Sequence, residues 1–453
     1  MLFHKKNIIN HLVILIILSF LQTNANYAND EMVEVYQENK PTFYSLRSEI
    51  ATVSETEFFD FLRISIIQQP EYSYALSDVV EKKMLLKFQQ RHRYPDLSLR
   101  LINDKVLSRD VDDFSSIRKR QDDSFDIALE INQPIYTGGS ISSRIKMARI
   151  EYMMSNNSKS SAFSELILDA SNIYLSAVKS DFLYSYGSNI LGELEPFLEK
   201  VRDRVNIGIS DPVELAIFSI KFNSLSSRIQ KLRTDRNRDI AIFEYFFKTK
   251  FNKHYFPEVF VPEIQVDNNE SYEVKTAKLG FENSKSNINL TKSEYRPQFG
   301  FNARYTSYDI DDSQKKDNDI RGGVFFSMPI FTFGRASSKI SSAKAMSNAK
   351  KMTIGIEKKA DEAKESELVN IVENSQSIRE DLIKSFSDTK YQREIIIDRL
   401  DVVSFSADAL VNSYTEELSM LESILNTEQQ LLQGYFMYLH QNKILLANIG
   451  ISP

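Results

Sequence analysis

The sequence predicts a mainly α-helical protein with membrane-inserted β-strands, built from two structural repeats that each contain a β-hairpin and very long helices. The main observation is a phrase that occurs twice, as PIYTGGSISSRI at 134–145 and as PIFTFGRASSKI at 329–340, with seven of twelve positions identical. At each copy, a strict alternation of apolar and polar residues changes to a helical period. The same phrase in the same context on both sides indicates one structural unit used twice.

Composition narrows the class of protein further. The chain has 453 residues, enough for two or three ordinary domains, and its net charge of −6 comes without a basic stripe, which argues against nucleic acid as a partner. Only 13 glycines and 11 prolines are present, which favours long uninterrupted elements. The absence of cysteine excludes disulfides, thiolate metal sites and a cysteine nucleophile.

The N-terminus predicts export. Lys5 and Lys6 precede an apolar run at 12–21, and a small-residue site ends at Ala25, as in a cleaved signal peptide. An uncleaved anchor is the alternative, although the run is shorter than the roughly 20 apolar residues of a transmembrane helix. No other stretch is apolar enough to span a bilayer as a helix, so membrane insertion would have to use strands.

The patterning divides the chain into segments. In order, these are a signal peptide (1–25), an N-terminal segment with the first helices (26–95), a first repeat (96–250) with a hairpin (96–133) and helices (140–205 and 212–247), an equatorial connector (251–275), a second repeat (276–447) with a hairpin (297–328) and helices (335–411 and 417–447), and a C-terminal tail (448–453). Within the first hairpin, Phe125, Ile127, Leu129 and Ile131 alternate with polar residues, which predicts a strand.

The helices predicted after each phrase are unusually long. A helix over 140–205 would extend about 100 Å at 1.5 Å per residue, more than a globular core can use. Gly208 can end this helix and Pro212 suits the first turn of the next, so a tight turn is expected between them. In the second repeat, a turn is expected near Tyr414.

The hairpins leave two environments open. Alternating strands can lie half-buried on an ordinary core, or they can face lipid on one side and water on the other. Four strands cannot close a barrel, and open strand edges are not tolerated in a bilayer. The membrane interpretation therefore requires several chains that contribute strands to one barrel.

At this point the chain resembles a TolC-type outer-membrane efflux protein. The resemblance rests on the strand-end phrase Met328–Gly334, its copy Gln133–Gly139, the turn sequence Arg204–Gly208 and Tyr414 at the second turn, and it covers nearly all of the mature chain. It implies a homotrimer with a 12-stranded β-barrel in the outer membrane. It also implies a continuous periplasmic α-helical barrel of about a dozen helices.

The resemblance implies a passive exit duct of a tripartite efflux or type I secretion system in a Gram-negative cell. A periplasmic adaptor would connect it to an inner-membrane pump, whose type (ABC, RND or MFS) the sequence does not distinguish, and outer-membrane lipid would surround the barrel. The cargo, small molecules or a secreted protein, stays open. No phosphate-cradling loop, histidine cluster or nucleophile elbow is present, so we expect no catalytic, cofactor or metal site and no enzyme. The alternative is an exported coiled-coil scaffold or adhesin without a channel.

The resemblance also implies a gate at the periplasmic helix ends. Glu214 aligns with an acidic partner of Tyr414, and we expect these two residues to form a latch. Ser419 stands where the family pattern has an arginine, so the salt bridge of that arginine is expected to be absent. Ser423 and Asn426 replace a ring of aspartates, so the acidic ring is expected to be absent as well.

The predicted gate positions have two alternative interpretations. Glu422 lies one residue from the ring and would restore negative charge if the alignment is shifted by one. Glu214 and Tyr414 can also be read as ordinary polar residues at helix ends. The remaining candidates are conformational, namely the strand-to-helix junctions Pro134, Gly138, Gly139, Pro329 and Gly334, where glycine permits backbone angles that other residues resist.

Overall fold

The computed structural model describes residues 51–105, 107, 124–252, 254–266, 269–308, 310, 317–399 and 407–451. The predicted signal peptide, residues 26–50, the segment 400–406 and most of both hairpin loops lie outside the described residues. The chain divides into two compact units. We call Met1–Ser65, Ile167–Val266 and Ser366–Leu439 the helical unit, and Ile66–Leu166, Asp267–Glu365 and His440–Pro453 the sheet unit.

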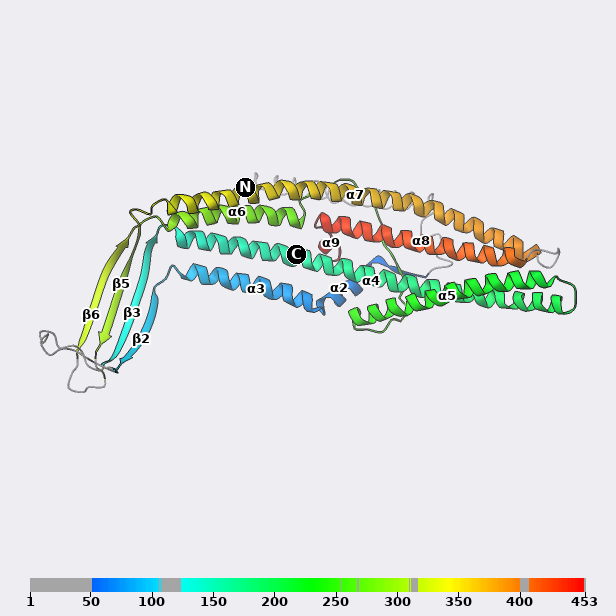
Figure 1. Ribbon diagram of the computed structural model, residues 1–453, viewed down its shortest axis with the longest axis horizontal. Coiled ribbons are helices and arrows are strands. Elements are labelled where there is room, and N and C mark those ends of the chain that lie inside the picture. Colours follow the sequence, from blue (N-terminus) through cyan, green and yellow to red (C-terminus); the bar gives the residue numbers. More distant parts are fainter. Residues whose placement is uncertain are drawn as a thin grey trace, which may run out of the picture. The chain divides into compact units, whose positions relative to one another are not determined.

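The described elements are drawn in Figure 1. In chain order they are β1 (Thr52–Ser54), α2 (Glu55–Ile67), α3 (Pro70–Arg91), β2 (Asp96–Asp104), β3 (Ser124–Thr137), α4 (Ser140–Asn206), α5 (Pro212–Phe247), β4 (Phe256–Glu258), α6 (Tyr272–Ser293), β5 (Gln298–Ser307), β6 (Asn318–Ser327), α7 (Arg335–Arg399), α8 (Ala407–Gln441) and α9 (Leu445–Asn448). Each predicted hairpin is therefore present, and each is followed by a helix of 65 or more residues.

The two hairpins form one antiparallel sheet in the sheet unit. Its strand order is β2-β3-β5-β6, and the four strands lie side by side in Figure 1. The first hairpin is longer than predicted, because β3 continues beyond 133 to Thr137 through a bulge between Pro134 and Tyr136. The central pairing of β3 with β5 joins the two halves of the sequence, which local patterns cannot specify.

The turn between α4 and α5 follows the predicted chemistry. Gly208 adopts φ 79°, and the N–H of Ile209 donates to the carbonyl of Arg204 at 2.8 Å, which closes the end of α4. Asp211 caps α5 by accepting from the N–H of Val213 at 2.9 Å, and Pro212 occupies the first helical position. Helix α4 passes through a proline at position 196 without ending.

The predicted turn near Tyr414 is wrong. Helix α7 ends at Arg399 instead of 411, and α8 runs over Ala407–Gln441 instead of 417–447, so Tyr414 lies inside a helix. The physical reason is visible in the burial of α8, whose buried apolar positions follow the helical period and lie on one face: Leu410, Val411, Tyr414, Leu418, Leu421, Ile424 and Leu425. A continuous apolar face of this kind specifies an uninterrupted helix.

The predicted connector 251–275 also contains regular structure. Strand β4 pairs in parallel with β1, with Thr52 opposite Phe256. The side chain of Ser271 accepts from the N–H of Val274 and begins α6, so the last part of the connector is helical.

The two units have different interiors. The helical unit has an aromatic core in which Phe58 meets Tyr174 with ring centroids 5.0 Å apart and Phe61 meets Phe247 at 4.9 Å. In the sheet unit, small polar side chains are buried between helices, namely Ser143, Ser155, Ser160 and Ser164 on α4, Ser286, Thr291 and Ser293 on α6, and Ser347 on α7. Small side chains at the contacts let these helices approach closely.

Candidate functional site

One face of the four-stranded sheet is apolar from edge to edge. Residues directly opposite each other on antiparallel strands share a face, and the register places Leu99 opposite Leu129, Leu129 opposite Tyr305, and Tyr305 opposite Ile320. The same register adds Leu97, Leu101, Phe125, Ile127, Ile131, Phe299, Phe301, Ala303, Val324 and Phe326. Leu99 is 64% exposed and Ile320 is 79% exposed. An open apolar face of this extent marks contact with another apolar surface.

The sheet has two edges. Within the described residues β2 pairs with β3 alone and β6 pairs with β5 alone, so each edge strand presents a row of backbone donors and acceptors. Strand direction alternates across the sheet, because all three pairings are antiparallel. A β2 strand from another copy would therefore run antiparallel to β6, which is the arrangement that continues this sheet.

The junctions that follow the hairpins share one backbone geometry. Gly138 and Gly139 adopt φ 65° and 97° before α4, and Phe333 and Gly334 adopt φ 48° and 84° before α7. Gly138 is also sterically required, since a Cβ there would lie 2.6 Å from the carbonyl oxygen of Ser293. The duplicated phrase thus encodes two consecutive left-handed residues that turn a strand end into a helix.

The two prolines of the phrase occupy different structures. Pro134 lies within β3, opposite Gly300 and beside the bulge. Pro329 follows β6 in a segment that is neither helix nor strand. The copies are therefore alike at the glycines and different at the prolines.

The α4–α5 turn exposes apolar side chains. Ile207, Ile209 and Val213 are 69%, 73% and 59% exposed. Glu214 lies one residue later, half-buried in the first turn of α5. This turn is consequently an apolar tip with an acidic residue at its base.

A polar cluster joins α4, α7 and α8 in the helical unit, with Tyr414 and Glu417 buried and Glu193 56% exposed at its margin. We call Tyr186, Glu193, Arg393, Tyr414 and Glu417 the helix-end cluster. The hydroxyl of Tyr414 donates to Oε2 of Glu193 at 2.5 Å, and the hydroxyl of Tyr186 donates to Oε1 of Glu417. Arg393 lies 3.2 Å from Glu417 and 3.9 Å from Glu193, with its guanidinium 4.9 Å from the centre of the Tyr414 ring.

The electrostatics of the helix-end cluster follow from its burial. The Glu417 side chain is fully buried and that of Arg393 is 14% exposed. Burial raises the pKa of Glu417, against the lowering effect of the Tyr186 hydroxyl and the Arg393 charge. Burial, followed by the bond to Glu193, raises the pKa of Tyr414. Arg393 therefore serves as the counter-charge for a carboxylate that has no contact with water.

The structure gives Tyr414 a different partner from the expected one. Its hydroxyl donates to Glu193 of α4, and the described contacts do not bring Glu214 to Tyr414 within the chain. Sequence reasoning missed Glu193 and Arg393, which carry no motif. A usable signal was Glu417, an acidic residue at a position of the buried face of α8 that requires a partner.

The remaining gate candidates lie along the middle of α8. Arg228 of α5 donates to Oγ of Ser419 and to Oε2 of Glu422, both at 2.7 Å. Lys179 of α4 donates to Oδ1 of Asn426 at 3.0 Å. Ser423 bonds the carbonyl of Ser419 within α8. The guanidinium of Arg228 on α5 therefore binds both Ser419 and Glu422 of α8.

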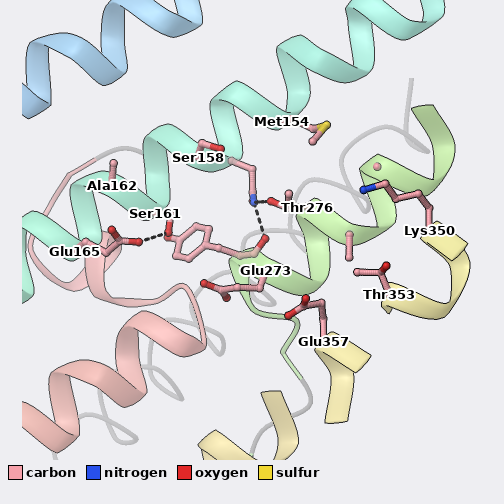
Figure 2. A pocket seen from close by; sticks show the side chains of 14 residues that line it. Met154, Ser158, Ser161, Ala162, Glu165, Glu273, Thr276, Lys350, Thr353 and Glu357 are labelled. Carbon is pink, nitrogen blue, oxygen red and sulfur yellow. Dashed lines mark hydrogen bonds between the residues drawn. The ribbon is translucent and has the colours of Figure 1, made fainter. Parts of the chain in front are cut away.

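A separate cavity of about 500 Å³ lies between α4, α6 and α7 of the sheet unit. Figure 2 shows Glu165, Glu273, Glu357 and Lys350 around it. At its wall, the buried Asn157 side chain bridges α4 to α6 by donating to the carbonyl of Tyr272 and the hydroxyl of Thr276 at 2.8 and 3.0 Å. Many of the residues that line the cavity are polar, and on its wall the hydroxyl of Ser161 donates to Oε1 of Glu165 at 2.8 Å, one helical turn along α4.

Two features are absent from the described residues. No cluster of three or more His, Cys, Asp or Glu side chains is arranged there to hold a metal ion. None of the helices described is both long and apolar enough to cross a membrane.

Comparison with known proteins gives structural likeness alone. No protein-family model matches the chain, and no curated protein matches its sequence. The CmeC outer membrane channel of Campylobacter jejuni matches with a TM-score of 0.74 and 11% identity, over 85% of each chain. The open state of the MtrE outer membrane channel of Neisseria gonorrhoeae matches with a TM-score of 0.72 and 13% identity, over 85% of this chain and 89% of that one.

A third match has the same character. The outer membrane protein VceC of Vibrio cholerae has a TM-score of 0.67 and 12% identity, over 87% of this chain and 97% of that one. At 11–13% identity the likeness shows the fold alone. The chain has the fold of the TolC-type outer-membrane channels.

Proposed function

We propose that the chain is the outer-membrane channel of a tripartite efflux or type I secretion system, a passive exit duct driven by an inner-membrane pump through a periplasmic adaptor. The observation that carries this proposal is the amphipathic sheet with an exposed apolar face and two open edges. Lipid is the surface that such a face fits, and strand pairing between copies is the way to satisfy the edges in a bilayer.

The size of the sheet supports a homotrimer. Two copies would give eight strands, whose barrel interior is filled by side chains, whereas three copies give 12 strands and room for a lumen. Tyr136, Tyr305, Phe331 and Phe333 are exposed near the sheet and would supply an aromatic belt at the membrane interface. A soluble scaffold or adhesin would leave the apolar face in water, which disfavours that alternative.

The helical unit supports the periplasmic part of the proposal. The exposed apolar tip at Ile207, Ile209 and Val213 suits docking of an adaptor helix hairpin, because apolar patches on helix turns are typical of protein contacts. The helix-end cluster would hold α7 and α8 to α4 in the closed entrance. Glu214 would then be available to a neighbouring copy, and its pairing with a tyrosine there stays a prediction.

The first test is the mass and location of the protein. Detergent-extracted protein from the outer-membrane fraction should be a trimer by light scattering, and a monomer in the soluble fraction would overturn the proposal. The chain has no cysteine, so double variants that combine Leu99→Cys on β2 with Ile320→Cys or with Val324→Cys on β6 test edge pairing over two registers. We expect oxidation to give a crosslinked ladder that stops at three copies, and single-cysteine variants are the control.

A second test separates the channel from its partner. Ile209→Asp places a charge on the tip while leaving the sheet untouched, so the trimer should form and conduct in planar bilayers while export in cells is lost. Thr234→Asp, on an exposed position of α5 away from the tip, is the matched control and should export normally. Normal export by Ile209→Asp would remove the tip from the proposed docking surface.

A further inference from the structure

The polar face of the sheet carries a band of arginines at mid-height. Across one row the register runs from Ser98 to Glu130, then Arg304 and Arg321, each directly opposite the next. Directly opposite residues have Cβ atoms about 5 Å apart, and like charges in that position destabilise a sheet. The pairing of Arg304 with Arg321 therefore destabilises the sheet.

The carboxylates of this band lie deeper than the guanidiniums. Glu130 is 13% exposed, while Arg304 is 54% and Arg100 is 60% exposed. Asp319 is 28% exposed beneath Arg321, which is 76% exposed. On this face of the sheet the carboxylates are therefore less exposed to solvent than the guanidiniums.

The charges of the band do not balance. Arg304 binds Oε1 of Glu130 at 2.7 Å, and Arg321 binds Oδ2 of Asp319 through Nε and Nη2 at 2.8 and 2.7 Å. Arg100 approaches Glu130 only to 3.8 Å, beyond hydrogen-bond distance. Three guanidiniums therefore face two carboxylates, which leaves one positive charge in excess at this level of the sheet.

A cleft of about 340 Å³ opens beside these arginines. Its charged lining residues are Arg304, Arg321 and Glu130, so two guanidiniums and one carboxylate border it. The amides of Asn132 and Asn302, which are opposite each other on β3 and β5, complete its polar lining. Gly323 stands opposite Asn302 and contributes no side chain, so the cleft stays open on the β6 side. Guanidinium forks and amide N–H groups are the donors that bind carboxylates and phosphates.

We propose that this cleft is an anion-binding site, with Arg304 and Arg321 as its principal ligands, for a small molecule that carries a carboxylate or phosphate group. An anion between the two guanidiniums offsets their mutual repulsion. It also accepts hydrogen bonds from the guanidinium N–H groups that Glu130 and Asp319 do not bind. In the proposed channel the polar face lines the lumen, so the site would favour anionic cargo; this consequence rests on the proposed function.

The same face carries other carboxylates, which define the extent of the site. Asp96 lies at the β2 end nearest α3, and Asp104 and Asp126 lie toward the hairpin loops. Residues of one face repeat at about 6.7 Å along a strand, so these groups stand one or more rows from the Arg304 row. The positive band is therefore narrow and bounded by negative rows on both sides.

The direct test measures the binding of inorganic phosphate to detergent-solubilised protein by calorimetry and by ³¹P line broadening. Neither measurement requires that the protein conduct ions. We expect saturable binding to the wild type and about tenfold or weaker affinity on loss of one charge-assisted arginine contact in Arg304→Gln or Arg321→Gln. Arg304→Lys should retain part of the affinity, because it keeps the charge and loses the fork.

Glu130→Gln removes a negative charge beside the arginines and should bind phosphate more tightly than the wild type. A variant that gains affinity separates the effect of charge from a loss of binding caused by misfolding. Lys285→Gln, an exposed lysine on α6, is the charge-matched control and should leave binding unchanged. Equal affinity in the wild type and Arg304→Gln, or weaker binding in Glu130→Gln, would overturn the site.

Planar-bilayer recordings separate the two proposals. In a KCl gradient the wild-type reversal potential should favour chloride relative to Arg304→Gln. Phosphate binding without any conductance would support the anion site and refute the channel. Conductance with no change of selectivity and no phosphate binding would support the channel and refute the anion site.

Discussion

The pairing of Arg393 with Glu417 gives the sharpest test of how the helical unit is held together. Substitution Arg393→Met keeps most of the volume and removes the charge. Glu417 is fully buried, so its carboxylate then loses the guanidinium 3.2 Å away and keeps only the weaker influence of Lys390. Removing one partner of a buried ion pair costs about 3–5 kcal/mol, whereas replacing both partners by neutral residues of similar size is often close to neutral. The double variant Arg393→Met, Glu417→Gln should therefore recover most of the loss.

Hydrogen exchange of the α8 backbone measures this loss locally. A cost of about 3 kcal/mol accelerates exchange through local opening by about two orders of magnitude. We expect that acceleration at pH 7 in Arg393→Met and near-wild-type exchange in the double variant. Unchanged exchange in Arg393→Met, or equally fast exchange in the double variant, would refute the assignment of Arg393 as the counter-charge.

The pH dependence of the same experiment has a fixed sign. Burial raises the folded-state pKa of Glu417 above its ordinary value of 4.5. The stability contributed by its protonation is fully present below 4.5 and is lost as the pH rises through the raised value. Acidification from pH 7 should therefore slow α8 exchange in the wild type relative to Glu417→Gln, and it should reduce the penalty of Arg393→Met.

Three further predictions concern other parts of the fold. Gly138→Ala places a Cβ 2.6 Å from a backbone carbonyl and should lower the thermal unfolding midpoint clearly more than Gly334→Ala, which meets nothing within 4 Å and costs only about 1–2 kcal/mol of left-handed strain; equal shifts would contradict this. Arg228→Ala removes an ion pair to Glu422 that is about one-third exposed on both sides and a hydrogen bond to Ser419, so its unfolding free energy should fall by about 1–2 kcal/mol in denaturant titrations. Burial lowers the pKa of His254 below 6.5, so the stability that its neutral ring supplies above pH 6.5 should be lost as the pH falls through the lowered value, and thermal scans of His254→Gln should lack this acid-sensitive part.

Local chemistry accounts for the elements that were predicted correctly. The alternation of Phe125, Ile127 and Leu129 defines a strand whose apolar side chains share a face, and the structure places them so. Gly208 and Pro212 end one helix and begin the next for reasons of backbone geometry that act over a few residues. Such signals need no knowledge of the rest of the chain.

The boundary between α7 and α8 was predicted at the wrong residue. No glycine or proline marks the end of α7 in the sequence, so turn chemistry gives no signal at this boundary. The apolar period through Leu410, Tyr414 and Leu418 continues across that point, and it defines the helix that the structure contains. Periodicity was the stronger evidence at this boundary.

The sequence by itself determined the hairpins, the long helices, the glycine junctions and the apolar strand face, because each depends on the preferences of residues close together in the chain. Only the tertiary structure decided which residues meet. Glu193 reaches Tyr414, and Arg304 stands opposite Arg321, because helix packing and strand register bring distant segments together. The physical reason is that a side chain's type sets what it can bind, while the packing of whole elements sets what lies within its reach.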